Sequence, residues 1–157
     1  MPYRQQPEPK SPRRPAFYIR AAGREHGFLD AGLEGRMMGG GILLGGMWSG
    51  SGKTTVTLGL LGALKARGVD VRGFKAGPDF IDAGLYSLVT GRPTYNLDPW
   101  MCGEAEMRET FARASSGGLA VVEGAMGLFD GVSGGAHLAE ALGIPVLLVV
   151  DADGMAD

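Results

Sequence analysis

The chain has 157 residues, a formal net charge of −2, and a composition that is 45% hydrophobic and 20% charged. This is enough to fold one domain, or a piece of a larger one, around a core, and the charge gives no reason to expect a nucleic-acid partner. A single cysteine excludes an internal disulfide framework and suits a reducing compartment such as the cytoplasm, and no apolar stretch is long enough to span a membrane.

Residues 1–38 differ in composition from the rest of the chain. Five prolines stand among charged and polar residues in 1–15, and the stretch from there to residue 38 shows no clear hydrophobic period. A segment of this kind buries too little apolar surface to offset the entropy lost on ordering. We therefore expect an irregular, flexible extension over 1–38 and a folded domain over 39–157.

From residue 39 onward, short apolar runs alternate with segments of helical spacing. In chain order they predict a strand at 41–45, a helix at 54–67, a strand at 69–75, helices at 82–90 and 104–114, a strand at 119–123, a helix at 136–142 and a strand at 145–151. Strands that alternate with helices and lack an in–out alternation of their own indicate a parallel sheet covered on both faces. The fold class is therefore α/β, in three layers.

Two details of this prediction concern the segment between the second and third predicted strands. Gly77-Pro78 ends the second strand, and Asp82 is a plausible N-cap for the short helix that follows. Residues 92–100 are expected to be irregular, with Asn96 and Asp98 shaping the bend around Pro99.

The strongest motif lies between the first predicted strand and the first predicted helix. It reads GMWSGSGKTT over residues 46–55. Glycines in such a loop let backbone N–H groups face a phosphate, and the helix N-terminus adds partial positive charge. Lys53 can reach the β- and γ-phosphates of a nucleotide, and the Thr54 hydroxyl can ligate Mg²⁺. The candidate nucleotide-binding residues are Gly46, Ser49, Gly50, Ser51, Gly52, Lys53, Thr54 and Thr55.

This loop departs from the usual phosphate-loop spacing. The first glycine is expected five residues before the Gly52 that precedes Lys53, where Met47 stands, and the glycine is instead Gly46. The loop is therefore one residue longer than the standard pattern.

Four further segments, together with the longer phosphate loop, carry a resemblance to a known family. They read FKAGPDFID (74–82), GRPTYNLDPWM (91–101), EGAMGLFDG (123–131) and PVLLVVDADG (145–154). The chain from residue 41 to its end resembles the cobyrinic (or hydrogenobyrinic) acid a,c-diamide synthase family. The second and third segments are specific to this branch and less expected in its relatives dethiobiotin synthetase and cobyric acid synthase.

The resemblance implies a fold and an activity. The fold would be P-loop NTPase-like, similar to dethiobiotin synthetase, with an incomplete sheet in this chain. The activity would be ATP- and Mg²⁺-dependent amidation of the a and c carboxylates of cobyrinic or hydrogenobyrinic acid, through an acyl phosphate and glutamine-derived ammonia. The partners would be the tetrapyrrole and a carboxy-terminal glutaminase domain, which we expect this chain to lack; neither nucleic acid nor a membrane is expected.

The resemblance also implies roles for four residues outside the phosphate loop. Lys75 would approach the reacting phosphate and carboxylate, and Thr54, Asp79 and Glu123 would surround Mg²⁺, whose hard charge prefers oxygen ligands. Asp130 would support the substrate side. With Lys75, Asp79 and Glu123 it completes the predicted catalytic set. Phe80 stands where the family usually has a tyrosine.

Each assignment has a structural alternative that the sequence leaves open. Lys75 could be an exposed strand-end lysine, Glu123 a structural acid, and Asp79 or Asp130 a turn former. Cys102 lacks a nearby histidine and is expected to be inert.

The function likewise has alternatives. Nickel-sirohydrochlorin could replace the corrin as the substrate. A ParA/MinD-like switch ATPase is another reading, although Met47 and Trp48 stand where such proteins usually carry a second lysine. The last alternative is that the chain is a fragment without function.

Overall fold

The computed structural model describes residues 17–22, 40–131 and 134–152. In this part of the chain six strands form one sheet, in the order β1-β6-β2-β5-β3-β4. The strands are β1 (Phe17–Ala22), β2 (Gly41–Gly46), β3 (Val71–Ala76), β4 (Tyr95–Leu97), β5 (Leu119–Glu123) and β6 (Val146–Asp151). All neighbours pair in parallel except β1, which pairs with β6 in the antiparallel direction.

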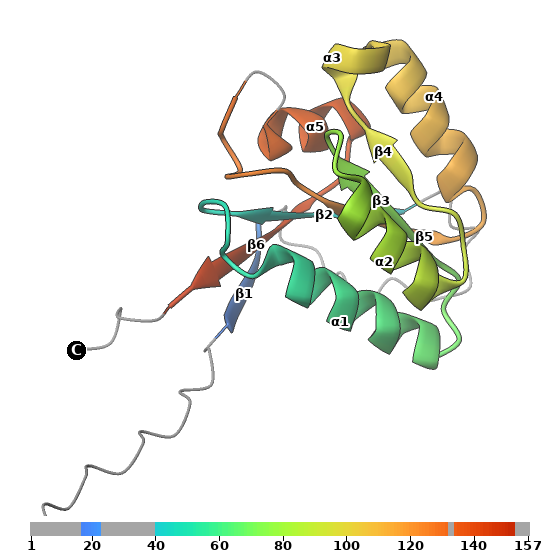
Figure 1. Ribbon diagram of the computed structural model, residues 1–157, viewed down its shortest axis with the longest axis horizontal. Helices are drawn as coiled ribbons and strands as arrows, with labels where there is room; N and C mark the ends of the chain where they lie inside the picture. Colours follow the sequence, from blue (N-terminus) through green and yellow to red (C-terminus); the bar gives the residue numbers. More distant parts are fainter. Residues whose placement is uncertain (1–16, 23–39, 132–133, 153–157) are drawn as a thin grey trace, which may run out of the picture.

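Helices cover both faces of this sheet (Figure 1). One face carries α1 (Lys53–Ala66) and α2 (Phe80–Thr90), and the other carries α4 (Glu104–Ser115) and α5 (Gly135–Leu142). A short helix, α3 (Pro99–Cys102), precedes α4. The predicted α/β three-layer fold with a parallel sheet is therefore confirmed.

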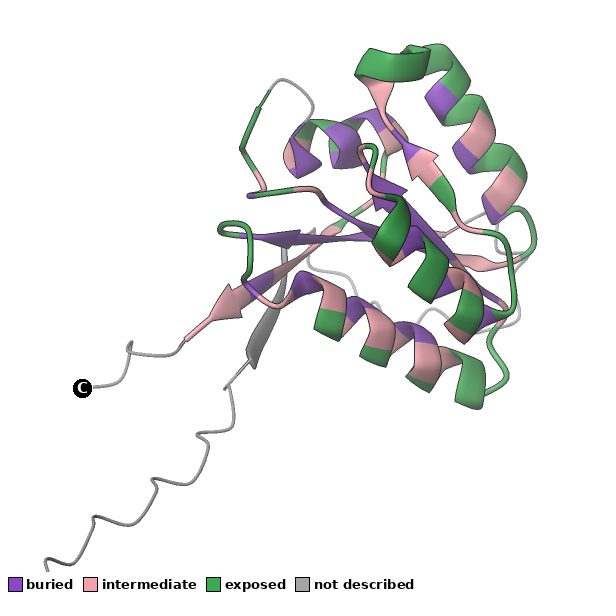
Figure 2. Cartoon of the chain, in the orientation of Figure 1, coloured by how far each residue is buried: buried purple, intermediate pink, exposed green. Residues whose placement is uncertain are grey.

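The core is split by the sheet into two apolar clusters. Adjacent strand residues face opposite ways, so Leu43 and Val122 pack under α4 and α5, whereas Leu44 and Val121 pack under α1 and α2. All four side chains are completely buried. Figure 2 shows buried strands at the centre of the molecule and exposed outer faces on the helices. Burial on both faces explains why the strands read as continuous apolar runs.

The strand register brings two charged residues side by side. β3 pairs with β5 so that Lys75 lies opposite Glu123. Both residues stand at the carboxyl ends of their strands, and the adjacent strand β2 ends at Gly46, where the phosphate loop begins. In open α/β sheets this edge is where ligands bind.

The structure differs from the sequence expectation at several elements. Strand β1 lies inside the extension that we expected to be irregular; the rest of that extension is outside the described residues. The segment 92–100 contains strand β4 and the start of α3, and is not irregular throughout. Pairing with a neighbouring strand, which local sequence does not report, explains β1 and β4. None of the helices in the described part of the chain has the length and apolarity that a membrane-spanning helix requires.

Candidate nucleotide-binding site

The phosphate loop joins β2 to α1 and has the backbone that its glycines predict. Gly50 and Gly52 have φ angles of 85° and 86°, in the left-handed region that favours glycine. Gly46 is required for a different reason. A Cβ added there would lie 2.2 Å from Ser51 Oγ and 3.0 Å from Lys53 Cδ. The first glycine of the motif therefore makes room for the buried side chains of the loop itself.

Lys53 is the first residue of α1, and its side chain is buried against the loop. Lys53 is only 6% exposed, and its Nζ donates a hydrogen bond of 2.9 Å to the Trp48 carbonyl oxygen. Burial lowers the pKa of Lys53, an effect opposed by the charge of Glu123 and strengthened by that of Lys75. A phosphate anion would supply the counter-charge that this ammonium group has only in part.

A closed ring of four polar groups lies beside Lys53, at the carboxyl ends of β3 and β5 and in the first turns of α1 and α2. The Lys75 ammonium is 2.7 Å from Asp82 Oδ2 and 2.8 Å from Glu123 Oε1. The Thr54 hydroxyl donates to the same two oxygens, at 3.2 Å and 2.8 Å. Lys75 and Glu123 are 5% and 1% exposed. Lys75 is thus a buried, paired lysine and not the exposed strand-end residue of the structural alternative.

The pairing in this ring sets the charge state of Lys75. Burial acts to lower the pKa of Lys75, but its hydrogen bonds and charge interactions with Asp82 and Glu123 outweigh burial and raise it above its ordinary value. The ammonium group is therefore held in its charged form. It can act as a fixed positive charge and has no tendency to act as a base near neutral pH.

The two aspartates near Lys75 have exchanged their expected positions. We predicted Asp82 as the N-cap, but α2 begins at Phe80 and its N-cap is Asp79. Asp79 Oδ1 accepts hydrogen bonds of 3.1 Å from the Ile81 N–H and 3.3 Å from the Asp82 N–H. Because the N-cap stands three residues earlier than predicted, Asp82 lies within the first turn of the helix and meets Lys75. Asp79 Oδ2 also lies 3.6 Å from the Lys75 ammonium group, at the margin of the ring.

Two further residues shape the loops around the site, Asp130 and Asn96. Asp130 Oδ2 accepts a hydrogen bond of 2.9 Å from the Gly127 N–H, so it shapes the loop after β5. That loop is joined to the phosphate loop, since the Leu128 N–H donates to the Gly46 carbonyl at 2.7 Å. Asn96 donates to the carbonyls of Gly77 and Asp79 and so holds the turn that precedes α2.

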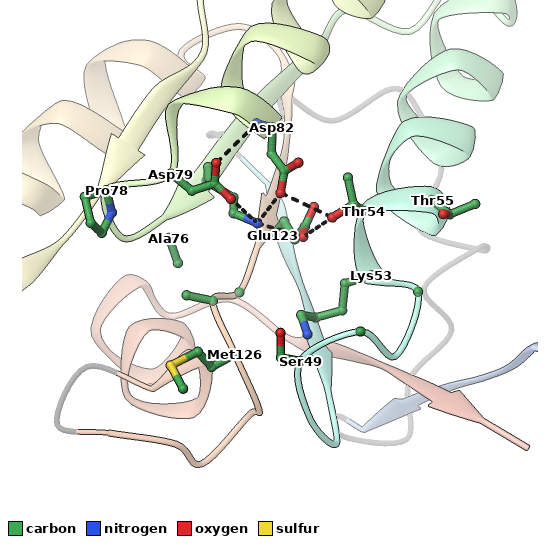
Figure 3. Close-up of a pocket in the computed structure, with 15 residues that line it drawn as sticks. Ser49, Lys53, Thr54, Thr55, Ala76, Pro78, Asp79, Asp82, Glu123 and Met126 are labelled. Carbon is green, nitrogen blue, oxygen red and sulfur yellow. Dashed lines mark hydrogen bonds and ion pairs between the residues drawn. The ribbon is translucent and has the colours of Figure 1, made fainter.

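A cavity of about 590 Å³ joins these elements into one site. Figure 3 shows Asp82, Glu123 and Thr54 together, with Lys53 and Ser49 of the phosphate loop nearby and Met126 on another wall. Met126 has a φ of 51°, a strained value for a residue with a side chain, and such strain clusters at ligand sites. Of the predicted site residues, Ser49, Gly50, Gly52, Lys53, Thr54, Thr55, Lys75, Asp79 and Glu123 line the cavity, while Gly46, Ser51 and Asp130 do not.

The oxygen atoms in this cavity are of the kind that bind Mg²⁺ in nucleotide-dependent enzymes. Within the described ranges no three His, Cys, Asp or Glu side chains converge as metal ligands. Two carboxylate oxygens, from Asp82 and Glu123, do converge on the Thr54 hydroxyl. Mg²⁺ commonly uses one or two carboxylates and takes its other ligands from water and substrate phosphates. The side chains present therefore suit an ion that takes its remaining ligands from water and from the phosphates of a nucleotide.

Two residues of the site were missed from the sequence. Asp82 was assigned to capping, and Tyr86 was not singled out. The Tyr86 hydroxyl donates to Glu123 Oε2, the carboxylate oxygen that does not face Lys75. Tyr86 follows Asp82 by four residues, which places both on one face of α2. That spacing of an acid and a tyrosine was the available signal.

Comparison with known proteins supports the nucleotide assignment. Residues 42–91 match the family model described as the CobQ/CobB/MinD/ParA nucleotide binding domain. The chain is 50% identical over 122 residues to the cobyrinate a,c-diamide synthase of Syntrophotalea carbinolica, which is 73% of this chain and 27% of that protein. No solved structure matches the chain significantly.

Other curated relatives give the same result. The chain is 50% identical over 117 residues to the hydrogenobyrinate a,c-diamide synthase of Mycobacterium tuberculosis strain H37Rv, covering 68% of this chain and 26% of that one. It is 44% identical over 114 residues to the cobyrinate a,c-diamide synthase of Clostridium tetani, covering 69% and 26%. The chain thus spans about a quarter of the length of the curated relatives it matches.

Proposed function

Since this chain belongs to the cobyrinate and hydrogenobyrinate a,c-diamide synthase family, we propose that it forms the ATP-binding part of an enzyme that amidates two carboxylates of a corrin precursor. The observation that carries the proposal is that the phosphate loop and the buried Lys75–Asp82–Glu123 group line the same cavity. A nucleotide and an acidic substrate would need cations and dry, fixed donors at one place.

The proposed reaction has two steps. An oxygen of the substrate carboxylate attacks the γ-phosphorus of ATP, the bond to the leaving ADP oxygen breaks, and an acyl phosphate forms. Ammonia then attacks the acyl carbon, phosphate leaves, and loss of a proton from nitrogen gives the amide. The ammonia would come from glutamine, through a glutaminase domain of the kind we expected from the resemblance.

The residues of the cavity are assigned to the first step. Lys53, whose ammonium is poorly compensated by its own surroundings, would bind the β- and γ-phosphates. Lys75, which is held in its charged form, would draw the anionic carboxylate towards the anionic phosphate. Both contributions lower the barrier by neutralising charge that the reactants bring together.

We also propose a change to the set of metal ligands that the resemblance implied. We propose Thr54, Asp82 and Glu123 as the protein ligands of Mg²⁺, with Asp79 acting through the start of α2. The bound ion would neutralise phosphate charge and fix the orientation of the phosphates. We assign Asp130 to shaping the loop after β5, which the Leu128–Gly46 hydrogen bond joins to the phosphate loop.

The first experiment measures nucleotide binding by the chain itself. The sequence has two tryptophans, and Trp48 lies in the phosphate loop, whereas Trp100 lies on α3. In a Trp100→Phe background, titration with ATP and Mg²⁺ should change the fluorescence of Trp48. Lys53→Ala removes a charge-assisted contact and should weaken binding about 10- to 100-fold.

A matched lysine on the same helix provides the control. Lys65 lies at the other end of α1, where its Nζ donates to the Val89 carbonyl at an exposed position. Lys65→Ala should bind ATP as the unmutated chain does. Equal binding by the Lys53 and Lys65 variants would refute the role of the phosphate loop.

The second experiment tests amidation without requiring glutamine. The chain is incubated with ATP, Mg²⁺ and ammonium chloride, in parallel with cobyrinic acid and with nickel-sirohydrochlorin, and products are identified by mass spectrometry. Conversion of carboxyl to amide groups on the corrin supports the proposal. ATP-dependent dimerisation without amide on either substrate would favour the switch ATPase instead.

A further inference from the structure

Tyr86 stands at the junction between the apolar core and the proposed metal site. Its side chain is completely buried among Leu44, Leu61 and Val121, in the cluster between the sheet and helices α1 and α2. β3 leaves room for it at Gly73, where an added Cβ would lie 2.8 Å from Tyr86 Cβ. The surrounding apolar side chains therefore confine the tyrosine side chain, whose hydroxyl reaches Glu123.

The hydroxyl distinguishes the two oxygens of Glu123. Oε1 accepts hydrogen bonds from Lys75 and Thr54 on the cavity side, while Oε2 accepts from Tyr86 on the core side. A carboxylate that is 1% exposed must have its oxygens satisfied by protein groups, because leaving one unpaired is costly. Tyr86 is the partner of Oε2 among the described residues.

The same helix also supplies the second carboxylate of the site. Asp82 and Tyr86 are one helical turn apart on α2, and both reach the Glu123–Lys75 pair. The Thr90 hydroxyl donates to the Tyr86 carbonyl at 2.8 Å, which adds a contact to the next turn. One rigid element therefore fixes Asp82 directly and Glu123 through the tyrosine.

We propose that Tyr86 is a positioning residue for the metal site: by binding Oε2 it holds Glu123 with Oε1 turned towards Thr54 and the cavity. This inference rests on the proposed function, because it takes Glu123 as a ligand of Mg²⁺. Groups that orient a metal ligand without touching the metal typically change metal affinity or activity by about 10- to 100-fold when they are removed.

The test is Tyr86→Phe in the Trp100→Phe background, with Tyr95→Phe as the matched control. Tyr95 lies on β4 and contacts Phe74 through its ring, and its hydroxyl has no hydrogen bond to the described residues. The measured quantity is the Mg²⁺ concentration that gives half of the Trp48 fluorescence change at fixed ATP. We expect this midpoint to rise about 10-fold or more in Tyr86→Phe and to stay within about twofold in Tyr95→Phe. ATP binding in EDTA should be equal in all three proteins.

The possible outcomes distinguish a failure of the positioning role of Tyr86 from a failure of the proposed function. An unchanged Mg²⁺ midpoint in folded Tyr86→Phe, with Mg²⁺-dependent binding in the unmutated chain, overturns the positioning role alone. Absence of any nucleotide binding by the unmutated chain overturns the proposed function and the inference together. A rise in the midpoint that Tyr95→Phe shares also overturns the positioning role, because it would follow from either lost hydroxyl.

A second measurement applies if Tyr86→Phe does not fold. 3-Fluorotyrosine placed at position 86 alone keeps the ring and the hydroxyl, and its ¹⁹F resonance reports on the Glu123 contact. We expect the resonance to shift when Mg²⁺ and ATP are added together. A resonance that stays in place while Trp48 reports binding would overturn the inference.

Discussion

Replacing Lys75 by methionine should reveal how much the ion pairs of Lys75 with Asp82 and Glu123 stabilise the protein when no nucleotide is added. The substitution keeps an unbranched apolar stem and removes the ammonium group, leaving Asp82 Oδ2 and Glu123 Oε1 facing each other without a cation. Breaking a buried ion pair from one side costs about 3–5 kcal/mol. Because Thr54 and Tyr86 still donate to Glu123, and the Asp82 side chain is 18% exposed, the lower end applies.

The expected loss is therefore about 3 kcal/mol in the free energy of unfolding, and about 6–12 °C in the melting temperature of a chain of this size. Urea titration followed by circular dichroism at pH 7 measures the first, and a thermal melt the second. Lys65→Met, at an exposed site, should cost less than about 1 kcal/mol. Adding Mg²⁺ should stabilise Lys75→Met more than the unmutated chain, since the ion can occupy the vacated acidic site.

The pH dependence gives an independent check. The folded-state pKa of Lys75 is raised above 10.5, so its contribution is fully present below that pH and is lost as the pH rises through the higher folded value. The stability difference between the unmutated chain and Lys75→Met should therefore stay constant through neutral pH and shrink only above about 10.5. A loss no larger than that of Lys65→Met at pH 7, or a difference that disappears well below pH 10, would refute this account of the ring.

Two further substitutions test neighbouring parts of the site. Gly46→Ala should lower the affinity for ATP, because the added Cβ would collide with Ser51 Oγ at 2.2 Å. The control is Gly59→Ala on α1, where a Cβ meets open space; it should leave ATP binding unchanged and raise the free energy of unfolding by about 0.5–1 kcal/mol. Trp48 fluorescence measures the binding and urea titration measures the stability. Asp79→Ala should cost about 1 kcal/mol through loss of the cap, and Asp79→Asn much less. Slight burial acts to raise the pKa of Asp79, but the hydrogen bond from the Asp82 backbone and the charge of Lys75 lower it below 3.8. The stabilisation that depends on the Asp79 charge is therefore present above pH 3.8 and is lost as acid is added. If the stability of Asp79→Asn fell with acid as steeply as that of the unmutated chain, this account would be contradicted.

Much of the architecture was predictable because its signals are local. The phosphate loop stands between an apolar run and an amphipathic helix, and the structure places it there. The closeness of Lys75 and Glu123 can also be inferred from local signals, since each ends a predicted strand and parallel strands place their carboxyl ends at one edge.

The errors arose where two local choices had similar energy, or where the partner was distant. Asp79 and Asp82 are equally good N-cap residues, and only the packing of α2 decides which one caps and which one meets Lys75. A tyrosine on the buried face of a helix is expected to be core; its contact with Glu123 spans 37 residues of sequence. Strand β1 depends wholly on pairing with β6, far along the chain.

The pairing of Lys75 with Glu123 across two strands has a consequence for how the chain folds. A parallel strand that slips by one residue turns its side chains to the opposite face of the sheet. Slippage of β3 against β5 would therefore bury the Lys75 ammonium among apolar groups and leave Glu123 without its counter-ion. Apolar strands such as β5 offer little else to distinguish one alignment from the next. The charged pair therefore raises the free energy of misaligned sheets relative to the observed register, whether or not a ligand is bound.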